Sequence, residues 1–170
     1  MTGAVMRSRW MAAAAIVLVA VSAGAGVASA EGEPTEPTRT EYVSTLEKIC
    51  KPGSDATERA VRGVRADVRA ERLAVAGGKF ARAERIFEST VRSISVVPRP
   101  PADRATLGRW FAALKREEVY LGQMVKVLRA NDVAGFERVS ARFIHEGNKA
   151  NNAVVSFGFN YCSFKPSRFQ

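Results

Sequence analysis

Histidine and cysteine are scarce in this chain: its 170 residues include one His, His145, and two Cys, Cys50 and Cys162. A single imidazole argues against a dedicated transition-metal site, because such sites take several His, Cys or carboxylate ligands. The two cysteines are far apart, so they form no Cys-x-x-Cys, Cys/His or Cys-x-x-Cys-His motif. We therefore predict no metal site and no cofactor.

Recognisable catalytic motifs are also missing. The sequence has no serine hydrolase, P-loop, dinucleotide-binding or kinase signature. It lacks helix-turn-helix, RNP and zinc-finger patterns, which argues against sequence-specific binding of nucleic acid. We predict that the protein is not an enzyme. The enzymatic alternative would draw its acid–base chemistry from Glu117, Glu118 and His145, without a recognisable nucleophile.

No stretch alternates apolar and polar residues as a half-buried strand does, whereas apolar residues spaced three and four apart recur through the chain. These spacings predict a short first helix that ends at Lys51-Pro52-Gly53 and a second that Gly77-Gly78 breaks. Three longer helices follow, over about residues 80–97, 103–128 and 136–161. We predict an all-α fold, an up-and-down antiparallel bundle of four main helices plus a short N-terminal helix.

Residues 1–30 have the layout of a cleavable secretory signal peptide: a basic start, an apolar middle and the small-residue ending Ala28-Ser29-Ala30. Cleavage after Ala30 would remove two arginines and no acidic residue, which lowers the formal net charge from +9 to +7. The competing interpretation is an uncleaved membrane anchor. We predict a secreted or extracytoplasmic basic protein with no transmembrane segment after cleavage.

The rest of the chain is long enough for one domain. Residues 31–40 hold three acids, two prolines and no large apolar residue, so we predict a disordered tether there. Thr38 and Glu41 fit a capping box at the start of the first helix. We assign residues 41–164 to the helical bundle and residues 165–170 to an irregular tail.

The two cysteines are predicted to form a disulfide. In the predicted bundle, the end of the last helix returns to the level at which the second helix begins, so Cys50 and Cys162 lie at the same end. An even pair of cysteines that meets this condition in an exported chain indicates a disulfide that closes the bundle.

Several short segments resemble those of a known group of proteins. They are Ile49-Cys50-Lys51, Val97-Pro98-Arg99-Pro100-Pro101, Asn151-Asn152 and residues 157–164, FGFNYCSF. With them the chain resembles a group of secreted actinobacterial all-helical proteins that have paired N- and C-terminal cysteines and no assigned activity. The resemblance implies export and paired cysteines, and it brings no catalytic residue.

Four arginines form a candidate anion-binding stripe on the predicted second helix, because their spacings of three, four and three place them on one face: Arg62, Arg65, Arg69 and Arg72. One interpretation is that neighbouring carboxylates or solvent compensate their charge. The other is an anionic partner, such as a wall polymer or a lipid headgroup, because the guanidinium group suits phosphate and carboxylate.

A second candidate site lies between the last two helices. Glu118 falls in the apolar seam of one and His145 lies nearly level with it on the other, although both also fit surface positions. Poor helix formers gather between Gly147 and Gly158, which indicates either close helix packing or a pocket. If a pocket forms, we expect Trp110, Asn151 and Tyr161 to line it.

The function that these patterns favour is that of an exported, non-enzymatic binding or interaction protein of the cell envelope. In this interpretation the arginine stripe contacts an anionic polymer or headgroup. The alternative is a carrier that holds a small hydrophobic ligand or haem within the bundle, near Trp110, Asn151 and Tyr161. No pattern in the sequence predicts an oligomeric state.

Overall fold

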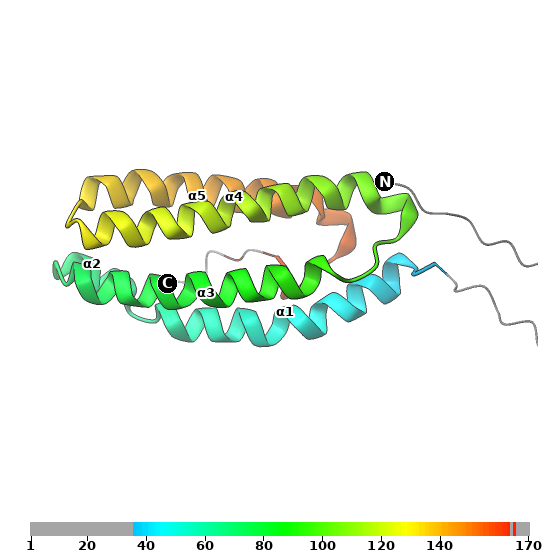
Figure 1. The fold of residues 1–170 in the computed structure, drawn as a ribbon, viewed down its shortest axis with the longest axis horizontal. Helices are drawn as coiled ribbons and strands as arrows, with labels where there is room; N and C mark the ends of the chain where they lie inside the picture. The colour runs from blue at the N-terminus through cyan, green and yellow to red at the C-terminus, as the bar shows by residue number, and fades with distance from the viewer. Residues whose placement is uncertain (1–35, 164, 166–170) are drawn as a thin grey trace, which may run out of the picture. The chain divides into compact units, whose positions relative to one another are not determined.

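A computed structural model describes residues 36–163 and 165, and it shows a bundle of α-helices (Figure 1). The predicted signal peptide lies outside the described residues, as does most of the predicted irregular tail. Four long helices form the bundle, with one short helix and two single turns of 3-10 helix between or after them. In chain order they are α1 (Arg39–Val61), α2 (Val64–Arg69), α3 (Leu73–Ser95), η1 (Pro101–Asp103), α4 (Arg104–Arg129), α5 (Val133–Ala153) and η2 (Val155–Phe157).

The long helices pack in two pairs. α1 packs on α3, α4 packs on α5, and the two pairs meet where α3 packs on α4. Figure 1 shows α1 and α3 side by side on one side of the bundle and α4 and α5 on the other. The prediction of an all-α bundle of four main helices closed by one disulfide is confirmed. The bundle is open along one edge, because α1 and α5 are not packed together along their length.

The predicted boundaries in the first half of the chain are wrong. The capping box forms as predicted, since the Glu41 amide donates to Thr38 Oγ1 (3.2 Å) and Glu41 Oε2 accepts from the Thr38 amide (2.8 Å). The helix that it starts continues through Pro52 to Val61, and its first residues, Arg39 and Thr40, belong to the segment predicted as a tether. The short helix of the fold is therefore α2 and not the first helix.

The chain turns at Gly63 and Glu71, before and after α2. Both residues have positive φ angles, 72° and 55°, which end the regular helix at those positions. Gly77-Gly78, predicted to break a helix, instead lies inside α3. A Cβ on Gly77 would lie 3.4 Å from the Leu128 side chain, so this glycine allows α3 and α4 to approach closely.

The end of α5 also differs from its prediction. The helix ends at Ala153 and not near Cys162, and η2 follows it. Gly158 then adopts a φ of 66°, and residues 158–163 continue without regular structure. We call residues 158–163 the C-terminal loop. Because this loop folds back, Cys162 reaches Cys50 halfway along α1, whereas the prediction placed the two cysteines at the end of a helix.

Candidate functional site: a groove between the two helix pairs

A groove of about 320 Å³ lies between the two helix pairs and takes residues from all four long helices. Its wall is mainly apolar. The aromatic residues in the wall come from α3, α4, α5 and the C-terminal loop, and they are Phe80, Phe87, Trp110, Phe136, Phe143 and Tyr161. Trp110 is buried, whereas the other five are half-buried. The groove therefore holds large apolar side chains that protein atoms cover only in part.

The groove exists because α5 is covered on one side only. α5 carries a regular apolar face, but among its large apolar residues Phe136, Val139 and Phe143 are only half-buried. Ile144, another residue of the groove wall, is 43% exposed. Packing α1 directly on α5 would bury this face. Since these two helices are not packed along their length, the face borders the groove instead.

Glu117 is the buried acid of the groove wall. It lies on α4 and is 1% exposed, and its Oε1 atom has no hydrogen-bond partner. Burial raises the pKa of this carboxyl to about 8, and the nearby charge of Glu146 adds to the shift. At neutral pH the group is therefore mostly an uncharged carboxylic acid, with one O–H to donate.

Glu117 differs in this respect from the other buried acids of the described residues, each of which binds a cation. Arg116 Nε donates to Glu146 at 2.7 Å, and Lys149 Nζ donates to it at 3.2 Å. Lys79 and Arg72 bind Asp67, and Arg39 binds Asp103. These hydrogen bonds lower the pKa of all three acids. Buried carboxylates in this protein are thus neutralised by pairing, except in the groove.

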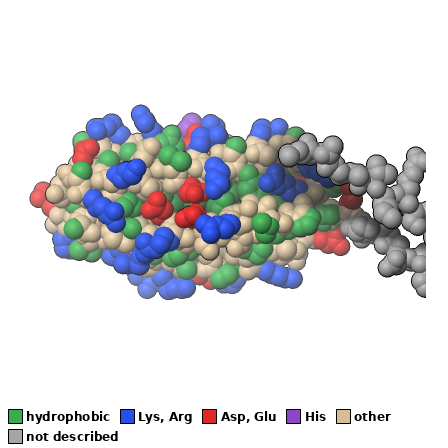
Figure 2. All heavy atoms as spheres, viewed as in Figure 1, with side chains coloured by type: hydrophobic (Ala, Val, Ile, Leu, Met, Phe, Trp, Pro, Cys, Tyr) green, Lys and Arg blue, Asp and Glu red, His purple; other side chains and the backbone are tan. Residues whose placement is uncertain are grey.

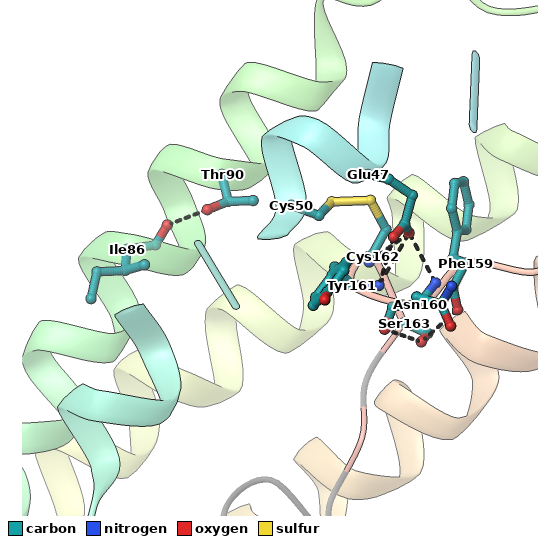
Figure 3. Close-up of a disulfide and its surroundings, with 9 residues drawn as sticks. All are labelled: Glu47, Cys50, Ile86, Thr90, Phe159, Asn160, Tyr161, Cys162 and Ser163. Atoms are coloured by element: carbon teal, nitrogen blue, oxygen red, sulfur yellow. Dashed lines mark hydrogen bonds between the residues drawn. A yellow bond between two sulfur atoms is a disulfide. The ribbon is translucent and has the colours of Figure 1, made fainter. Parts of the chain in front are cut away.

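The C-terminal loop forms part of the groove wall, and a covalent contact and a group of hydrogen bonds help to hold it on α1 (Figure 3). The disulfide between Cys50 and Cys162 is the covalent contact. The second is the Glu47 carboxylate, one turn earlier on α1, which accepts hydrogen bonds from the amides of Asn160 (2.9 Å) and Tyr161 (3.1 Å). Figure 3 shows these amides pointing toward Glu47 beside the disulfide. Loop residues therefore form a fixed part of the groove wall.

The structure brings together three of the five residues predicted for a pocket. Trp110, Asn151 and Tyr161 line the groove. Glu118 and His145 do not. Glu118 binds Lys115 at 2.8 Å on the surface of α4, and the His145 side chain is exposed. They take the surface positions that were the other interpretation, and only the idea that they belong to a pocket is wrong.

The acid that lines the groove is Glu117. The prediction had chosen the next residue, Glu118. A spacing of three and four residues continues from Trp110 through Leu114, Glu117 and Leu121 to Met124, and all five are buried. That spacing was visible in the sequence and could have identified Glu117. The prediction assigned the seam to Glu118 because Leu114 and Leu121 flank both glutamates.

The four arginines of the predicted stripe do not share one helix, so the prediction of one helix face is wrong. Arg62 follows α1, Arg65 and Arg69 belong to α2, and Arg72 precedes α3. All four are exposed, but Arg72 binds Asp67 at 2.7 Å and Arg65 also borders the groove. In Figure 2, Lys and Arg side chains are spread over the visible face with acidic side chains between them.

The described residues contain no group of three or more His, Cys, Asp or Glu side chains placed to hold a metal ion. Within the same part of the chain, no helix has the length and apolarity needed to cross a membrane. Comparisons of the chain with known protein families, with curated proteins and with solved structures find no match. The groove and the arginines are therefore interpreted from their own geometry.

Proposed function

We propose that this protein binds a small apolar molecule in the groove and acts as an extracytoplasmic carrier of that molecule. The observation that carries this proposal is the groove itself, about 320 Å³ in volume and lined mainly by apolar and aromatic side chains. This volume falls within the range of small-molecule sites, which are concave and mostly apolar with few polar groups.

Packing supports this proposal. Protein interiors are normally filled to a density like that of organic crystals, and unfilled apolar space loses dispersion contacts. Here five aromatic side chains border unfilled space, and a ligand in the groove would supply the missing contacts. The disulfide and the predicted signal peptide favour an oxidising compartment outside the cytoplasm, where a carrier would take up its ligand.

Haem is not part of this proposal. A histidine side chain is a common haem ligand, but His145 is exposed and does not line the groove. The soft donor in the groove wall is the Met124 thioether, which already accepts a hydrogen bond from Ser140 Oγ at 3.4 Å. We expect no Soret band at a defined stoichiometry when haem is added to the protein.

The groove can be tested by filling it. Thr57 lines the groove from α1 and is half-buried, so Thr57→Trp should place a large side chain in the ligand space. Thr45→Trp is the matched control, because Thr45 is exposed on the same helix and does not line the groove. A neutral apolar fluorophore, N-phenyl-1-naphthylamine, serves as the probe.

We expect saturable binding of about one probe per wild-type chain, a loss of about tenfold or more in affinity in Thr57→Trp, and little change in Thr45→Trp. Circular dichroism would show that both variants are folded. The proposal is wrong if the wild type shows no saturable binding, or if both tryptophan variants bind the probe as the wild type does.

A second candidate function is attachment to an anionic envelope polymer or headgroup. The observation that favours it is that Arg62, Arg65 and Arg69 are exposed within one short segment at the connection between α1 and α3. Guanidinium groups bind phosphate and carboxylate well, and such exposed contacts weaken as salt increases.

Charge reversal tests this attachment. Arg62→Glu with Arg69→Glu should reduce retention on heparin or teichoic acid at low salt more than Arg82→Glu with Arg85→Glu, an equal charge change at exposed positions of α3. Equal losses in the two variants would indicate a response to net charge alone, and unchanged retention would exclude the site.

A further inference from the structure

We infer that the groove selects an uncharged apolar molecule that carries an oxygen acceptor, such as a ketone or an ester, and that the Glu117 carboxyl donates a hydrogen bond to this oxygen. The inference rests on the proposed carrier function and adds the chemical class of the ligand. It also makes Glu117 the residue that determines specificity.

The position of Glu117 is the first support. Buried polar side chains nearly always find a hydrogen-bond partner, and the few that do not call for an explanation. Glu117 is 1% exposed, its Oε1 atom has no partner, and it forms part of the wall of an unfilled apolar groove. Oε1 is itself buried in the wall, so a ligand in the groove would reach it by a shift of neighbouring side chains and would then supply the partner that the protein itself does not provide.

Two neighbouring hydroxyl groups of the groove wall are already engaged. Thr90 Oγ1 also lines the groove, but it donates to the carbonyl oxygen of Ile86 at 2.9 Å. The Ser140 hydroxyl donates to Met124 Sδ. These two hydroxyl groups are engaged within their own helix or with the neighbouring helix, whereas the Glu117 carboxyl is not.

The charges around Glu117 indicate why the ligand is uncharged. Of the charged groups on the elements around it, Glu146 of α5 acts on it, and Glu146 is itself bound by Arg116 of α4 and Lys149 of α5. Glu84 of α3 lies against Gly122, and Arg65 of α2 and Lys165 border the groove elsewhere. None of these cations is bonded to Glu117, and burial raises the pKa of its carboxyl to about 8.

A protonated carboxyl offers one O–H donor in an apolar wall, and its complement is a neutral oxygen acceptor. A cationic ligand would require Glu117 to lose its proton before the two could pair. An anionic ligand would bring a further negative charge close to Glu146. Hydrogen bonding in a dry site discriminates strongly, because a buried polar group left unpaired is unfavourable.

The test compares three ligands of equal chain length, decane, decan-2-one and decylamine, by displacement of N-phenyl-1-naphthylamine. At about pH 6, the affinity for decan-2-one relative to that for decane should be about tenfold higher in the wild type than in Glu117→Leu, since one net hydrogen bond contributes roughly that much. This preference should fall at about pH 9.5, where Glu117 is ionised and has no proton to donate.

Two substitutions at Glu117 separate the effect of its donated hydrogen bond from the effect of its side-chain shape. Glu117→Gln keeps a donor that does not titrate, so its preference for the ketone should persist at both pH values. Glu117→Leu should favour decane over decan-2-one, because the ketone oxygen then loses its hydration without gaining a partner. Glu118→Leu is the control, because Glu118 binds Lys115 outside the groove, and this variant should behave as the wild type.

Each other result overturns the inference. The same ketone-to-decane affinity ratio in the wild type and in Glu117→Leu would show that Glu117 takes no part in selection, even with the carrier function intact. A preference for decylamine that increases with pH and disappears in Glu117→Gln would show that the ligand is a cation. Failure of the wild type to bind the fluorophore would instead reject the carrier function itself.

Discussion

Glu117 destabilises the protein that contains it, and this cost points to a role beyond folding. In the unfolded chain its carboxyl has an ordinary pKa of 4.5, whereas burial raises the pKa to about 8 in the folded state. An aliphatic residue in this wall would avoid that penalty. Groups that lower stability yet lie in a cleft are often functional, because binding sites and stability make opposing demands.

The pH dependence of stability follows from the direction of this shift. The folded state holds the Glu117 proton more tightly than the unfolded state does. Its contribution to stability is therefore complete below about pH 4.5 and is lost as the pH rises to about 8, where the folded state also releases the proton. At pH 7 the difference amounts to about 3 kcal/mol as an upper value, from 1.36 kcal/mol per pKa unit.

We predict that Glu117→Gln raises the free energy of unfolding at pH 7 by about 1–3 kcal/mol and changes it little at pH 4.5. Thermal unfolding at the two pH values measures this difference. Glu118→Gln, at a surface position, should change stability by only about 0.5 kcal/mol at either pH. A wild type whose stability rises between pH 5 and pH 7 relative to Glu117→Gln would contradict the raised pKa.

At the scale of single elements, α1 depends on its contact with α3. Pro52 lies in the middle of α1 and removes one backbone donor, which normally kinks or ends a helix. Figure 1 shows α1 bent and continuous. The next residue, Gly53, packs so closely on Thr90 of α3 that a Cβ there would lie 2.2 Å from Thr90 Oγ1. This close approach fixes α1 against α3 immediately after the proline.

We predict that Gly53→Ala destabilises the protein by about 1–3 kcal/mol through steric overlap with Thr90. Rotation of the threonine would not relieve the overlap, since its Cγ2 and Cβ atoms also lie within 3.2 Å of the added carbon. Gly78→Ala is the matched control. A Cβ on Gly78 meets no atom within 4 Å, so this helical substitution should stabilise by about 0.5–1 kcal/mol.

A second substitution tests the cause of the Gly53 effect. Thr90→Ala removes both branches of the threonine, so it should reduce the cost of Gly53→Ala when the two changes are combined. Urea unfolding of the four variants forms a double-mutant cycle. Additive losses would show that the methyl group added at position 53 does not meet the Thr90 side chain, and would argue against the close approach of α1 and α3.

The helices were more predictable from the sequence than their ends. Spacings of three and four identify helices through packing faces, and these faces do form in α3, α4 and α5. Glycine and proline mark ends only when no neighbour supports the helix. Pro52 remains helical beside Gly53, which packs on α3, and Gly77 remains helical where α4 packs on it, whereas Gly63 ends α1 in the left-handed region. Those contacts depend on tertiary structure that the local sequence does not contain.

The candidate site was predictable only in part for the same reason. Antiparallel pairing was expected to place Trp110 level with Asn151, Tyr161 was expected near them, and all three do line one groove. The choice between Glu117 and Glu118 depends on the rotation of α4, which packing sets. The groove itself arises because α1 and α5 do not pack along their length. The spacing of apolar residues along the chain does not show which helices pack on each other.

At the scale of the whole molecule, the C-terminal loop joins the two helix pairs at the open edge. α1 belongs to one pair, and the loop follows α5 of the other. Cys162 binds Cys50 covalently, and Glu47 accepts hydrogen bonds from the loop amides. The Phe159 ring stacks on Trp110 of α4 at 5.3 Å. The loop thus holds its part of the groove wall in place. The rest of the groove stays unfilled.

The disulfide should therefore stabilise both the fold and the groove. Its cysteines are 112 residues apart, for which chain entropy gives a contribution of nearly 5 kcal/mol, although realised values are commonly about 2–4 kcal/mol. We predict that Cys50→Ser with Cys162→Ser leaves a folded helical protein that unfolds at a lower temperature, because α1 still packs on α3. Hydrogen exchange should increase first at the amides of Asn160 and Tyr161, since they lose the covalent tie of the neighbouring Cys162 and keep only non-covalent contacts such as those to Glu47.

The same variant tests whether the loop shapes the groove. With the disulfide removed, the loop can leave α1, and Tyr161 and Ser163 can leave the groove wall. We expect the affinity for N-phenyl-1-naphthylamine to fall by about three- to tenfold, with the smaller loss at low temperature, where the Glu47 contacts persist. Glu47→Gln in the oxidised protein is the control, because its loop stays tethered and should keep most of the affinity. Unchanged thermal unfolding and probe binding in the double-serine variant would show that the bridge stabilises neither the bundle nor the groove.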